Sequence, residues 1–315
     1  MILLRILVTG GAGFIGSNLV DLLLEKGHKV FVVDNLITGQ ADHINQKAIF
    51  YEADINSNLL ESIFIEATPE IVFHLAAQSN VNVSLHNPIL DETNNIQGTI
   101  NVLEMCRRHR VDKLVYSSSA AVYGKPISNP ISEDHTTLPI SFYGVSKLAP
   151  EYYIQIYSSL YNFKYTILRY ANAYGPRQNY IGEGGVISIF LNKLLEDSPI
   201  TIYGTGHQTR DFVYVKDIIK ANYLAMSKGH NEIYNIGTKS AVNLNELVSV
   251  LSEIADKNPE VIYEAERPGD IPHSCLDSTK ASRHLLWSPD YSLKEGLYET
   301  YNYYKFERNK AGFAL

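Results

Sequence analysis

The sequence predicts an α/β protein in which a doubly wound parallel sheet is joined to a smaller, mixed α/β C-terminal lobe. Two observations predict this fold. In the first half of the 315-residue chain, short runs rich in Val, Ile and Leu alternate with helix-length segments, and a glycine-rich turn follows the first run. Apolar residues fill the runs continuously, as expected for parallel strands that helices cover on both faces.

The expected strands occupy residues 6–8, 30–33, 48–52, 71–74, 113–116 and 165–169. Beyond about residue 182 the pattern changes to mixed short elements, turns such as "TIYGTG" and "RPGDIP", and helical periodicity over residues 244–254 and 293–304. We therefore expect a sheet domain over residues 1–181 and a second lobe over residues 182–315, interleaved with the first.

Composition narrows the class of protein. The formal charge of -7 argues against a nucleic-acid partner, because binding a phosphate backbone needs a basic surface. Cys106 and Cys275 have no metal-binding spacing and indicate reduced thiols in a cytoplasmic protein. The apolar start "MILLRILV" is too short for a signal peptide or a membrane helix, so we expect a buried strand there and no membrane partner.

The glycine-rich turn "TGGAGFIG" places Gly10, Gly13 and Gly16 between the first strand and a helix over residues 17–26. Residues without Cβ let the backbone approach a pyrophosphate, and the helix start offers free N–H groups to it. Asp34 ends the second strand, where it can bind both ribose hydroxyls and repel a 2′-phosphate, which favours NAD over NADP. The alternative is an ordinary tight turn with a solvated aspartate, but the combined context favours a Rossmann-type NAD site.

Two Tyr-x-x-x-Lys pairs occur, Tyr143 with Lys147 and Tyr301 with Lys305. Only the first follows a strand that ends in serines, "LVYSSSAAVYG", at the edge where doubly wound sheets bind ligands. A phenol with a pKa of about 10 needs about 4 kcal/mol of help to ionise at pH 7. An ammonium about 5 Å away supplies roughly 3 kcal/mol, and a cationic nicotinamide could supply the rest. We therefore expect Tyr143 and Lys147 to be the catalytic pair.

The motifs "TGGAGFIG", "DNL", "HLAAQ", "NNIQGT", "SSSAAVYG", "YGVSK", "RYANAYGPRQ" and "RPGDI" span residues 7–277. Together they resemble the extended short-chain dehydrogenase/reductases, specifically the nucleotide-sugar 4-epimerases of the UDP-glucose/UDP-galactose type. The resemblance implies NAD-dependent 4-epimerisation of a UDP-sugar through a 4-keto intermediate, as in galactose metabolism, and a homodimer.

The resemblance also assigns residues. It implies Ser119, Tyr143 and Lys147 as the catalytic set. The cofactor contacts that it implies are Gly10, Gly13, Phe14, Ile15, Gly16, Asp34, Asn35, Asp54, Ile55, Leu75, Ala76, Ala77, Asn95, Tyr143 and Lys147. Pro150, three residues after Lys147, is a departure from the family pattern. Proline lacks the N–H that a helix interior needs, so we expect the helix to bend there. His74 ends a buried strand and is expected to be a hydrogen-bonded structural residue.

Arginines of the second lobe, Arg210 and Arg267, suit bidentate contact with a pyrophosphate. The resemblance adds Asn172 at the phosphate, Tyr203 near the uracil and Asp270 at the nucleotide ribose. It also places the residue four positions beyond Asp270 in the sugar pocket. That residue is Ser274, and a small side chain there leaves room for an N-acetyl group, so we expect UDP-N-acetylglucosamine and UDP-N-acetylgalactosamine as further substrates. The alternative is that Ser274 is a solvent-facing turn residue.

Two other functions compete with epimerisation. One is a dehydratase, decarboxylase or reductase of the same family. The dehydratases and decarboxylases usually carry an acid just after the catalytic Ser or Thr, whereas here Ala120 and Ala121 follow Ser119. A non-catalytic NAD-binding sensor commonly loses the tyrosine or the lysine, and this chain keeps both. The homodimer would form through helices over residues 92–108 and 142–160, whose apolar residues could equally face the chain's own sheet. Those residues include Val102, Leu103, Leu148 and Ile156.

Overall fold

The computed structural model describes residues 3–179, 185–266 and 271–312. Within these residues the central sheet has seven strands, all parallel, in the order β10-β6-β5-β4-β1-β2-β3. The strands are β1 (Arg5–Thr9), β2 (Lys29–Asp34), β3 (Ile49–Glu52), β4 (Ile71–His74), β5 (Lys113–Ser119), β6 (Lys164–Tyr170) and β10 (Glu232–Ile236). This order confirms the predicted doubly wound sheet and all six predicted strands.

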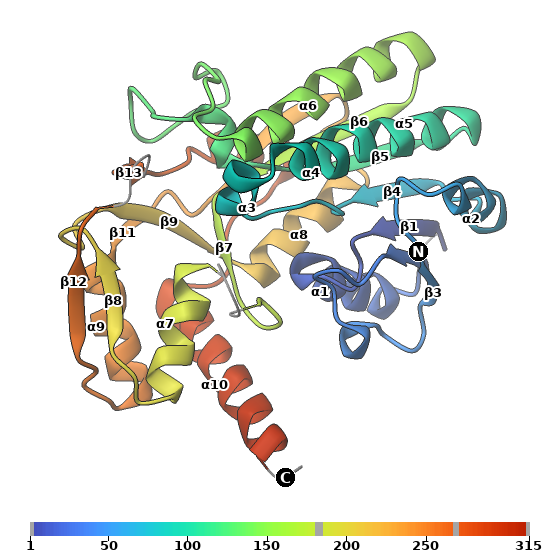
Figure 1. The fold of residues 1–315 in the computed structure, drawn as a ribbon. Helices are drawn as coiled ribbons and strands as arrows, with labels where there is room; N and C mark the ends of the chain where they lie inside the picture. Colours follow the sequence, from blue (N-terminus) through green and yellow to red (C-terminus); the bar gives the residue numbers. More distant parts are fainter. Residues whose placement is uncertain (1–2, 180–184, 267–270, 313–315) are drawn as a thin grey trace.

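Helices cover both faces of the sheet (Figure 1). One face packs against α1 (Phe14–Glu25) and α8 (Val215–Ala225), and the other against α2 (Leu59–Ala67), α5 (Gly98–Arg108) and α6 (Phe142–Tyr161). Neighbouring residues of β1 therefore enter different cores: Ile6 and Val8 pack on the α1 side, and Leu7 packs on the α2 side. Burial on both faces explains why these strands are apolar without alternation.

Helix α6 runs unbroken through Pro150, so the proline does not end it. The Ser141 hydroxyl accepts the N–H of Gly144 at 3.1 Å and caps the helix start. A Cβ at Gly144 would lie 2.7 Å from the carbonyl oxygen of Ala121, so only glycine lets the helix start approach the end of β5 this closely. This close approach sets Tyr143 beside the carboxyl end of β5.

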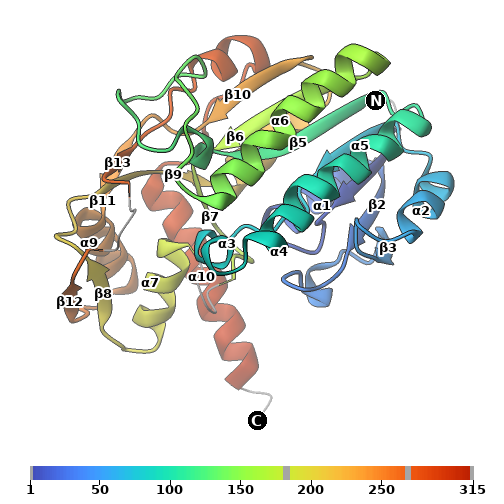
Figure 2. The same cartoon turned by 45° about the horizontal axis from the view of Figure 1, so that its top comes forward.

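The second lobe contains a small mixed sheet and a two-stranded parallel sheet (Figures 1 and 2). Its strands are β7 (Asn172–Tyr174), β8 (Ile200–Tyr203), β9 (Thr209–Tyr214), β11 (Ala241–Asn243), β12 (Val261–Glu264) and β13 (His273–Ser274). Its helices are α7 (Val186–Leu195), α9 (Leu244–Ala255) and α10 (Leu293–Gly312). Strand β9 is the centre of the mixed sheet, because β7, β11 and β13 all pair with it.

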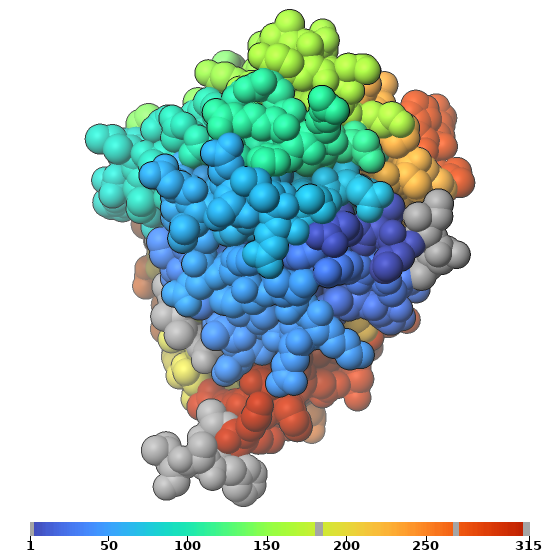
Figure 3. Space-filling view, turned by 90° about the vertical axis from the view of Figure 1, so that its right-hand side faces the viewer, coloured from blue at the N-terminus to red at the C-terminus, as the bar shows by residue number. Residues whose placement is uncertain are grey.

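Short helical elements complete the described chain: α3 (Val81–His86), α4 (Pro88–Glu92), η1 (Ala41–His43), η2 (Thr93–Gln97), η3 (Ala120–Tyr123) and η4 (Ala281–Leu285). Elements α4, η2 and α5 follow one another without a break, which gives the helical segment predicted over residues 92–108 an earlier start. Figure 3 shows one side of the molecule, where the N-terminal part of the chain (blue) lies between the green helical layer and the C-terminal residues (red).

The predicted boundary at residue 182 lies outside the described residues, and the division into two domains stays a prediction. The chain does cross between the lobes more than once, since β10 and α8 return to the large sheet after α7 and β8. Among the described residues, no helix has both the length and the apolar character needed to cross a membrane.

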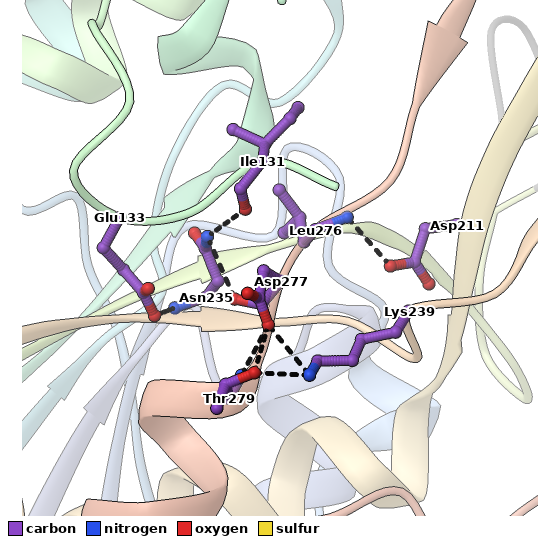
Figure 4. A network of polar contacts seen from close by, with 8 residues as sticks. All are labelled: Ile131, Glu133, Asp211, Asn235, Lys239, Leu276, Asp277 and Thr279. Carbon is purple, nitrogen blue, oxygen red and sulfur yellow. Dashed lines mark hydrogen bonds and ion pairs between the residues drawn. The ribbon is translucent and has the colours of Figure 1, made fainter. Parts of the chain in front are cut away.

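Polar contacts join the two lobes at the end of β10 (Figure 4). The Asn235 side chain donates to the carbonyl oxygen of Ile131 at 2.9 Å, and its backbone N–H donates to Glu133 at 2.8 Å. The backbone N–H of Asp277 also donates to the Ile131 carbonyl, at 2.7 Å. The segment that carries β13 is therefore fixed to the large domain by a buried amide and by main-chain hydrogen bonds.

Candidate functional site

The glycine-rich turn between β1 and α1 leaves no room for side chains. Gly10 has a φ of +72°, and a Cβ there would lie 2.6 Å from the backbone nitrogen of Ala76. A Cβ at Gly16 would overlap the carbonyl oxygen of Gly10. Gly13 is the N-cap of α1, and within the described structure no side chain caps this helix start. The free N–H groups and the positive end of the helix dipole suit a pyrophosphate.

Asp34 is fixed beside this turn at the end of β2. Its carboxylate accepts the N–H of Ala12 at 2.9 Å and that of Leu36 at 2.9 Å, and its side chain is buried. Asn35 follows and donates to the Asp54 carboxylate at 2.7 Å, which brings the ends of β2 and β3 together. The structure thus brings a helix start without a side-chain cap and a buried carboxylate to one edge of the sheet, an arrangement that fits a dinucleotide such as NAD.

The other predicted cofactor residues lie at or near the same edge. Phe14 and Ile15 begin α1, Ile55 follows Asp54, and Leu75, Ala76 and Ala77 follow β4. Asn95 is buried, accepts the N–H of Gln78 at 2.8 Å, and donates to the Ser146 hydroxyl at 2.9 Å. Asn95 therefore ties the loop after β4 to α6, next to the predicted catalytic pair.

The predicted catalytic residues meet at the carboxyl end of β5. Ser119 ends β5 and Tyr143 begins α6, and the Ser119 side chain lies close enough to act on the Tyr143 hydroxyl. Lys147, which is buried, donates from Nζ to the carbonyl oxygen of Ser117 at 2.9 Å, and its Nζ lies 5.2 Å from the centre of the Tyr116 ring. The side chains of Ser119 and Tyr143 thus lie together, with the buried amino group of Lys147 behind them.

In the protein without a cofactor, burial dominates the protonation of this pair. Burial raises the pKa of Tyr143, and the Ser119 side chain only opposes that rise. Burial lowers the pKa of Lys147 to about 8, against the opposing charges of Asp91 and Glu151. Without a bound cofactor the phenol therefore stays protonated at neutral pH, and the expectation that Lys147 and a cationic nicotinamide together lower the Tyr143 pKa stays a prediction. A further positive charge is needed to make the phenol a base at neutral pH, and a bound nicotinamide would bring one.

The second pair lies away from this edge, in α10. Tyr301 is buried in the hydrophobic core, and Lys305 lies with its Nζ 5.6 Å from the centre of the Tyr301 ring. This contact is a packing interaction.

His74 agrees with its predicted structural role. Its ring nitrogens bond to the hydroxyls of Thr9 at 2.7 Å and Thr99 at 3.0 Å. Burial lowers its pKa to about 3, with a smaller contribution from Lys147, so the ring stays neutral.

Three predicted substrate residues lie on neighbouring strands of the mixed sheet. Arg210 is on β9, Ser274 pairs with it from β13, and Asn172 pairs from β7 with Phe212, two residues further along β9. The Arg210 guanidinium donates to the carbonyl oxygens of Thr209 at 2.9 Å and of Pro272 at 3.3 Å. Ser274 is half-buried in a strand and is not a solvent-facing turn residue.

Of the other three predicted substrate residues, the structure describes only Tyr203. Tyr203 ends β8 and is half-buried. Arg267 and Asp270 lie outside the described residues.

Sequence reasoning missed a buried ion pair behind the catalytic edge, between Glu151 of α6 and Arg169 of β6. Glu151 stands four residues after Lys147, so the two share a helix face. That spacing was the available signal, together with the arginine at the end of the sixth predicted strand.

A tyrosine–lysine pair beside a dinucleotide-type turn defines the class as a Rossmann-fold, nicotinamide-dependent enzyme of the short-chain dehydrogenase/reductase type. The model of the NAD dependent epimerase/dehydratase family matches residues 6–237. The chain belongs to that family.

Individual relatives narrow the comparison. A UDP-glucose 4-epimerase of Mycolicibacterium smegmatis is 39% identical over 98% of this chain and 100% of its own length. The structure of the Thermotoga maritima UDP-glucose 4-epimerase with UDP-glucose is 44% identical, with a TM-score of 0.95 over 96% of this chain and 99% of that one. A UDP-N-acetylglucosamine 4-epimerase from Methanobrevibacter ruminantium, in complex with UDP-N-acetylmuramic acid, is 34% identical, with a TM-score of 0.93 over 98% of this chain and 100% of that one.

Proposed function

We propose that this chain is an NAD-dependent 4-epimerase of UDP-sugars that interconverts UDP-glucose and UDP-galactose. The observation that carries the proposal is the meeting of Ser119, Tyr143 and Lys147 at the same sheet edge as the glycine-rich turn and Asp34. The family and the full-length relatives named UDP-glucose 4-epimerase support the same activity.

The residues divide the work as follows. Tyr143 takes the proton of the sugar 4-hydroxyl and later returns it, while Ser119 holds the reacting oxygen by a hydrogen bond. Lys147 supplies a buried positive charge and fixes the end of β5 through the Ser117 carbonyl. NAD, when bound by the turn, Asp34 and Asn95, supplies the hydride acceptor and donor. The 4-keto sugar must turn over between the two transfers so that hydride returns to its other face.

A dehydratase or decarboxylase remains the competing activity within the family. Those reactions need an acid or base to remove a further group. Ala120 and Ala121 follow Ser119 in η3, and neither can transfer a proton. This favours epimerisation, which needs only one proton-transferring residue.

The proposed substrate range includes the N-acetylated sugars. Ser274 is half-buried and pairs with Arg210 across β13 and β9, and its small side chain supports the assignment to a sugar pocket with room for an N-acetyl group. The relative from Methanobrevibacter, named a UDP-N-acetylglucosamine 4-epimerase, supports this extension. We assign Asn172, Tyr203, Arg210, Arg267, Asp270 and Ser274 to the UDP-sugar.

The proposed assembly is a homodimer through α6. Val102 and Leu103 are buried in the chain's own core, and Leu148 packs against it, so they do not face a partner. Ile156 is 56% exposed, and Tyr152 and Leu160 lie one turn to either side of it with 57% and 66% exposure. This spacing makes one apolar stripe along the outside of α6, as expected for a helix that packs on a second chain.

A cytoplasmic location completes the proposal. Cys106 and Cys275 are free and buried, and burial raises the pKa of both thiols. Unpaired cysteines are typical of a reducing compartment.

Incubation of the purified protein with UDP-galactose tests the activity. We expect UDP-glucose to form until the two sugars reach equilibrium, with no steady production of NADH. Accumulation of NADH or of a dehydrated sugar would contradict the proposal, and absence of any reaction would favour the NAD-binding sensor.

A further inference from the structure

A buried ion pair lies directly behind the catalytic edge. Arg169 of β6 donates to the Glu151 carboxylate from Nε at 3.0 Å and from Nη2 at 2.5 Å. The side chains of Arg169 and Glu151 are only 5% and 2% exposed. Such a bidentate pair has a fixed geometry, but burial of two charges makes it a poor source of stability. Stability alone therefore does not explain why this ion pair lies directly behind Ser119, Tyr143 and Lys147.

The Glu151 carboxylate also reaches the strand that carries Ser119. The buried Ser118 hydroxyl donates to it at 2.5 Å. Ser118 lies between Ser117, whose carbonyl accepts from Lys147, and Ser119, whose side chain lies close to the Tyr143 hydroxyl. Lys147 and Glu151, on successive turns of α6, thus hold two consecutive residues of β5, Ser117 and Ser118, directly before Ser119.

The far side of the ion pair is anchored as well. Arg169 donates from Nη1 to the Tyr123 hydroxyl at 2.9 Å, and that hydroxyl donates to the Asn235 side chain at 2.7 Å. Asn235 in turn bonds to the segment around Ile131 that fixes β13. Each polar group in this chain of contacts has a partner, as expected for a buried network that holds one arrangement.

We propose that Glu151, held by Arg169, is a positioning residue for proton transfer at Tyr143, acting through Ser118. The inference rests on the proposed epimerase activity. Glu151 does not touch the reacting atoms; it fixes the backbone on which Ser119 and the Ser117 carbonyl stand. Reacting groups must be held to a fraction of an ångström, so loss of this contact lowers the rate without removing any catalytic residue.

Ser118→Ala tests the contact with minimal damage, because it removes one hydroxyl from the buried strand. Ser158→Ala is the matched control: Ser158 is also buried, lies on α6, and donates to the Phe163 carbonyl at 2.6 Å, away from the catalytic edge. We expect both variants to lose similar thermal stability. Only Ser118→Ala should lower kcat, by about tenfold, with KM for the UDP-sugar little changed.

Two charge variants give a readout that a merely structural role would not move. Lys147 is faced by Asp91 of α4, Glu151 of α6, Tyr116 of β5 and His74 of β4. Glu151→Gln leaves the Arg169 charge uncompensated and favours loss of a proton from the Tyr143–Lys147 pair. Arg169→Met leaves the Glu151 carboxylate without its partner, and the added negative charge favours retention of that proton by the Tyr143–Lys147 pair.

The acidic limb of the rate profile should therefore shift to lower pH in Glu151→Gln and to higher pH in Arg169→Met. The Tyr143 phenolate can be followed by its absorption in each NAD-loaded variant, after subtraction of the spectrum of the same variant carrying Tyr143→Phe. The pH at which this absorption appears should shift in the same directions. The proposal would be overturned if Ser118→Ala and Ser158→Ala had the same kcat. It would also be overturned if the phenolate pKa shifted in the same direction in Glu151→Gln and Arg169→Met. An inactive wild-type protein would instead refute the proposed function.

Discussion

At the scale of single residues, the proposed function depends on Tyr143, a tyrosine whose buried environment opposes the loss of its proton. Burial raises the pKa of Tyr143, and the nearby Lys147 is itself brought down to about 8 by burial. The protein alone therefore keeps the phenol protonated. Because the positive charge that completes the site would arrive with oxidised NAD, proton removal from the sugar is coupled to the presence of the hydride acceptor.

Tyr143→Phe should retain the fold and bound NAD and lose at least about a hundredfold in kcat, the usual contribution of a general base. Steady-state interconversion of UDP-glucose and UDP-galactose measures this loss. Tyr301→Phe is the control, since that tyrosine packs in the core beside Lys305, and its rate should stay close to wild type. An equal loss of kcat in Tyr143→Phe and Tyr301→Phe would contradict the assignment of Tyr143 and Lys147 as the catalytic pair.

Ser274→Tyr should abolish turnover of UDP-N-acetylglucosamine and spare that of UDP-glucose. The added ring would narrow the sugar pocket to which Ser274 is assigned, and steric exclusion acts mainly on the bulkier sugar. Parallel assays with the two sugars check this prediction. Wild-type protein that epimerises UDP-glucose but neither N-acetylated sugar would contradict it.

At the scale of elements, the strands of the large sheet were predictable because burial on both faces leaves a continuous apolar run in the sequence. The predicted cofactor turn and the catalytic pair could be placed because both lie where a strand of that sheet meets a helix. Elements of the second lobe were harder, since β13 has two residues and β7 has three. Such strands are defined by their pairing with β9, and no local pattern predicts a pairing partner.

The buried network behind the site was also beyond sequence reasoning. Ser118, Glu151, Arg169, Tyr123 and Asn235 come from five separate elements. Each taken alone is an ordinary polar residue, and only the packing of α6 on β5 and β6 brings the first three together. Long-range contacts of this kind leave no periodic signal in the chain.

A lysine at the opposite end of β5 predicts how stability depends on pH. Lys113 is 2% exposed and donates to the Lys228 carbonyl at 2.6 Å, and burial, with a smaller effect of Lys164, lowers its pKa to about 7. The unfolded chain binds the proton up to a pKa near 10.5, so between these values it holds more protons than the folded protein. Stability therefore rises with pH across this window.

Lys113→Met should remove that dependence. The wild-type free energy of unfolding should increase by about 1–2 kcal/mol more than that of the variant between pH 7 and pH 9. Chemical denaturation at the two pH values gives the comparison. Lys164→Met should keep most of the dependence, because Lys164 is exposed and makes only the smaller contribution to the Lys113 pKa. An identical slope in Lys113→Met and wild type would show that Lys113 is charged in the folded state.

At the scale of the whole molecule, the proposed function draws on both of the larger sheets. The seven-stranded sheet carries the proposed cofactor turn and proton-transfer pair, and the mixed sheet around β9 carries the proposed substrate residues Asn172, Arg210 and Ser274. The contacts of Asn235 with Ile131 and Asp277 hold the strand β13 to the large domain (Figure 4). In the described residues, a buried junction therefore links β13, which carries the proposed substrate residue Ser274, to the seven-stranded sheet.

Ile156→Glu should convert the proposed dimer into a monomer. The carboxylate would fall in the centre of the apolar stripe on α6, and burial of an unpaired charge is strongly unfavourable. Light scattering should give twice the chain mass of 35.4 kDa for wild type and the single mass for the variant. Ile65→Glu, at an exposed isoleucine of α2, should stay dimeric. A wild-type monomer at micromolar concentration would refute the dimer.

The central claim is that the hydride removed from C4 of the sugar stays in the site and returns to the same carbon. UDP-glucose labelled with deuterium at C4 tests this most directly, with the product UDP-galactose analysed by mass spectrometry and NMR. The account predicts complete retention of deuterium at C4 in wild-type protein and no conversion in Tyr143→Phe beyond its residual rate. Loss of the label to solvent during epimerisation would contradict it, because the carbon-bound hydrogen would then leave as a proton.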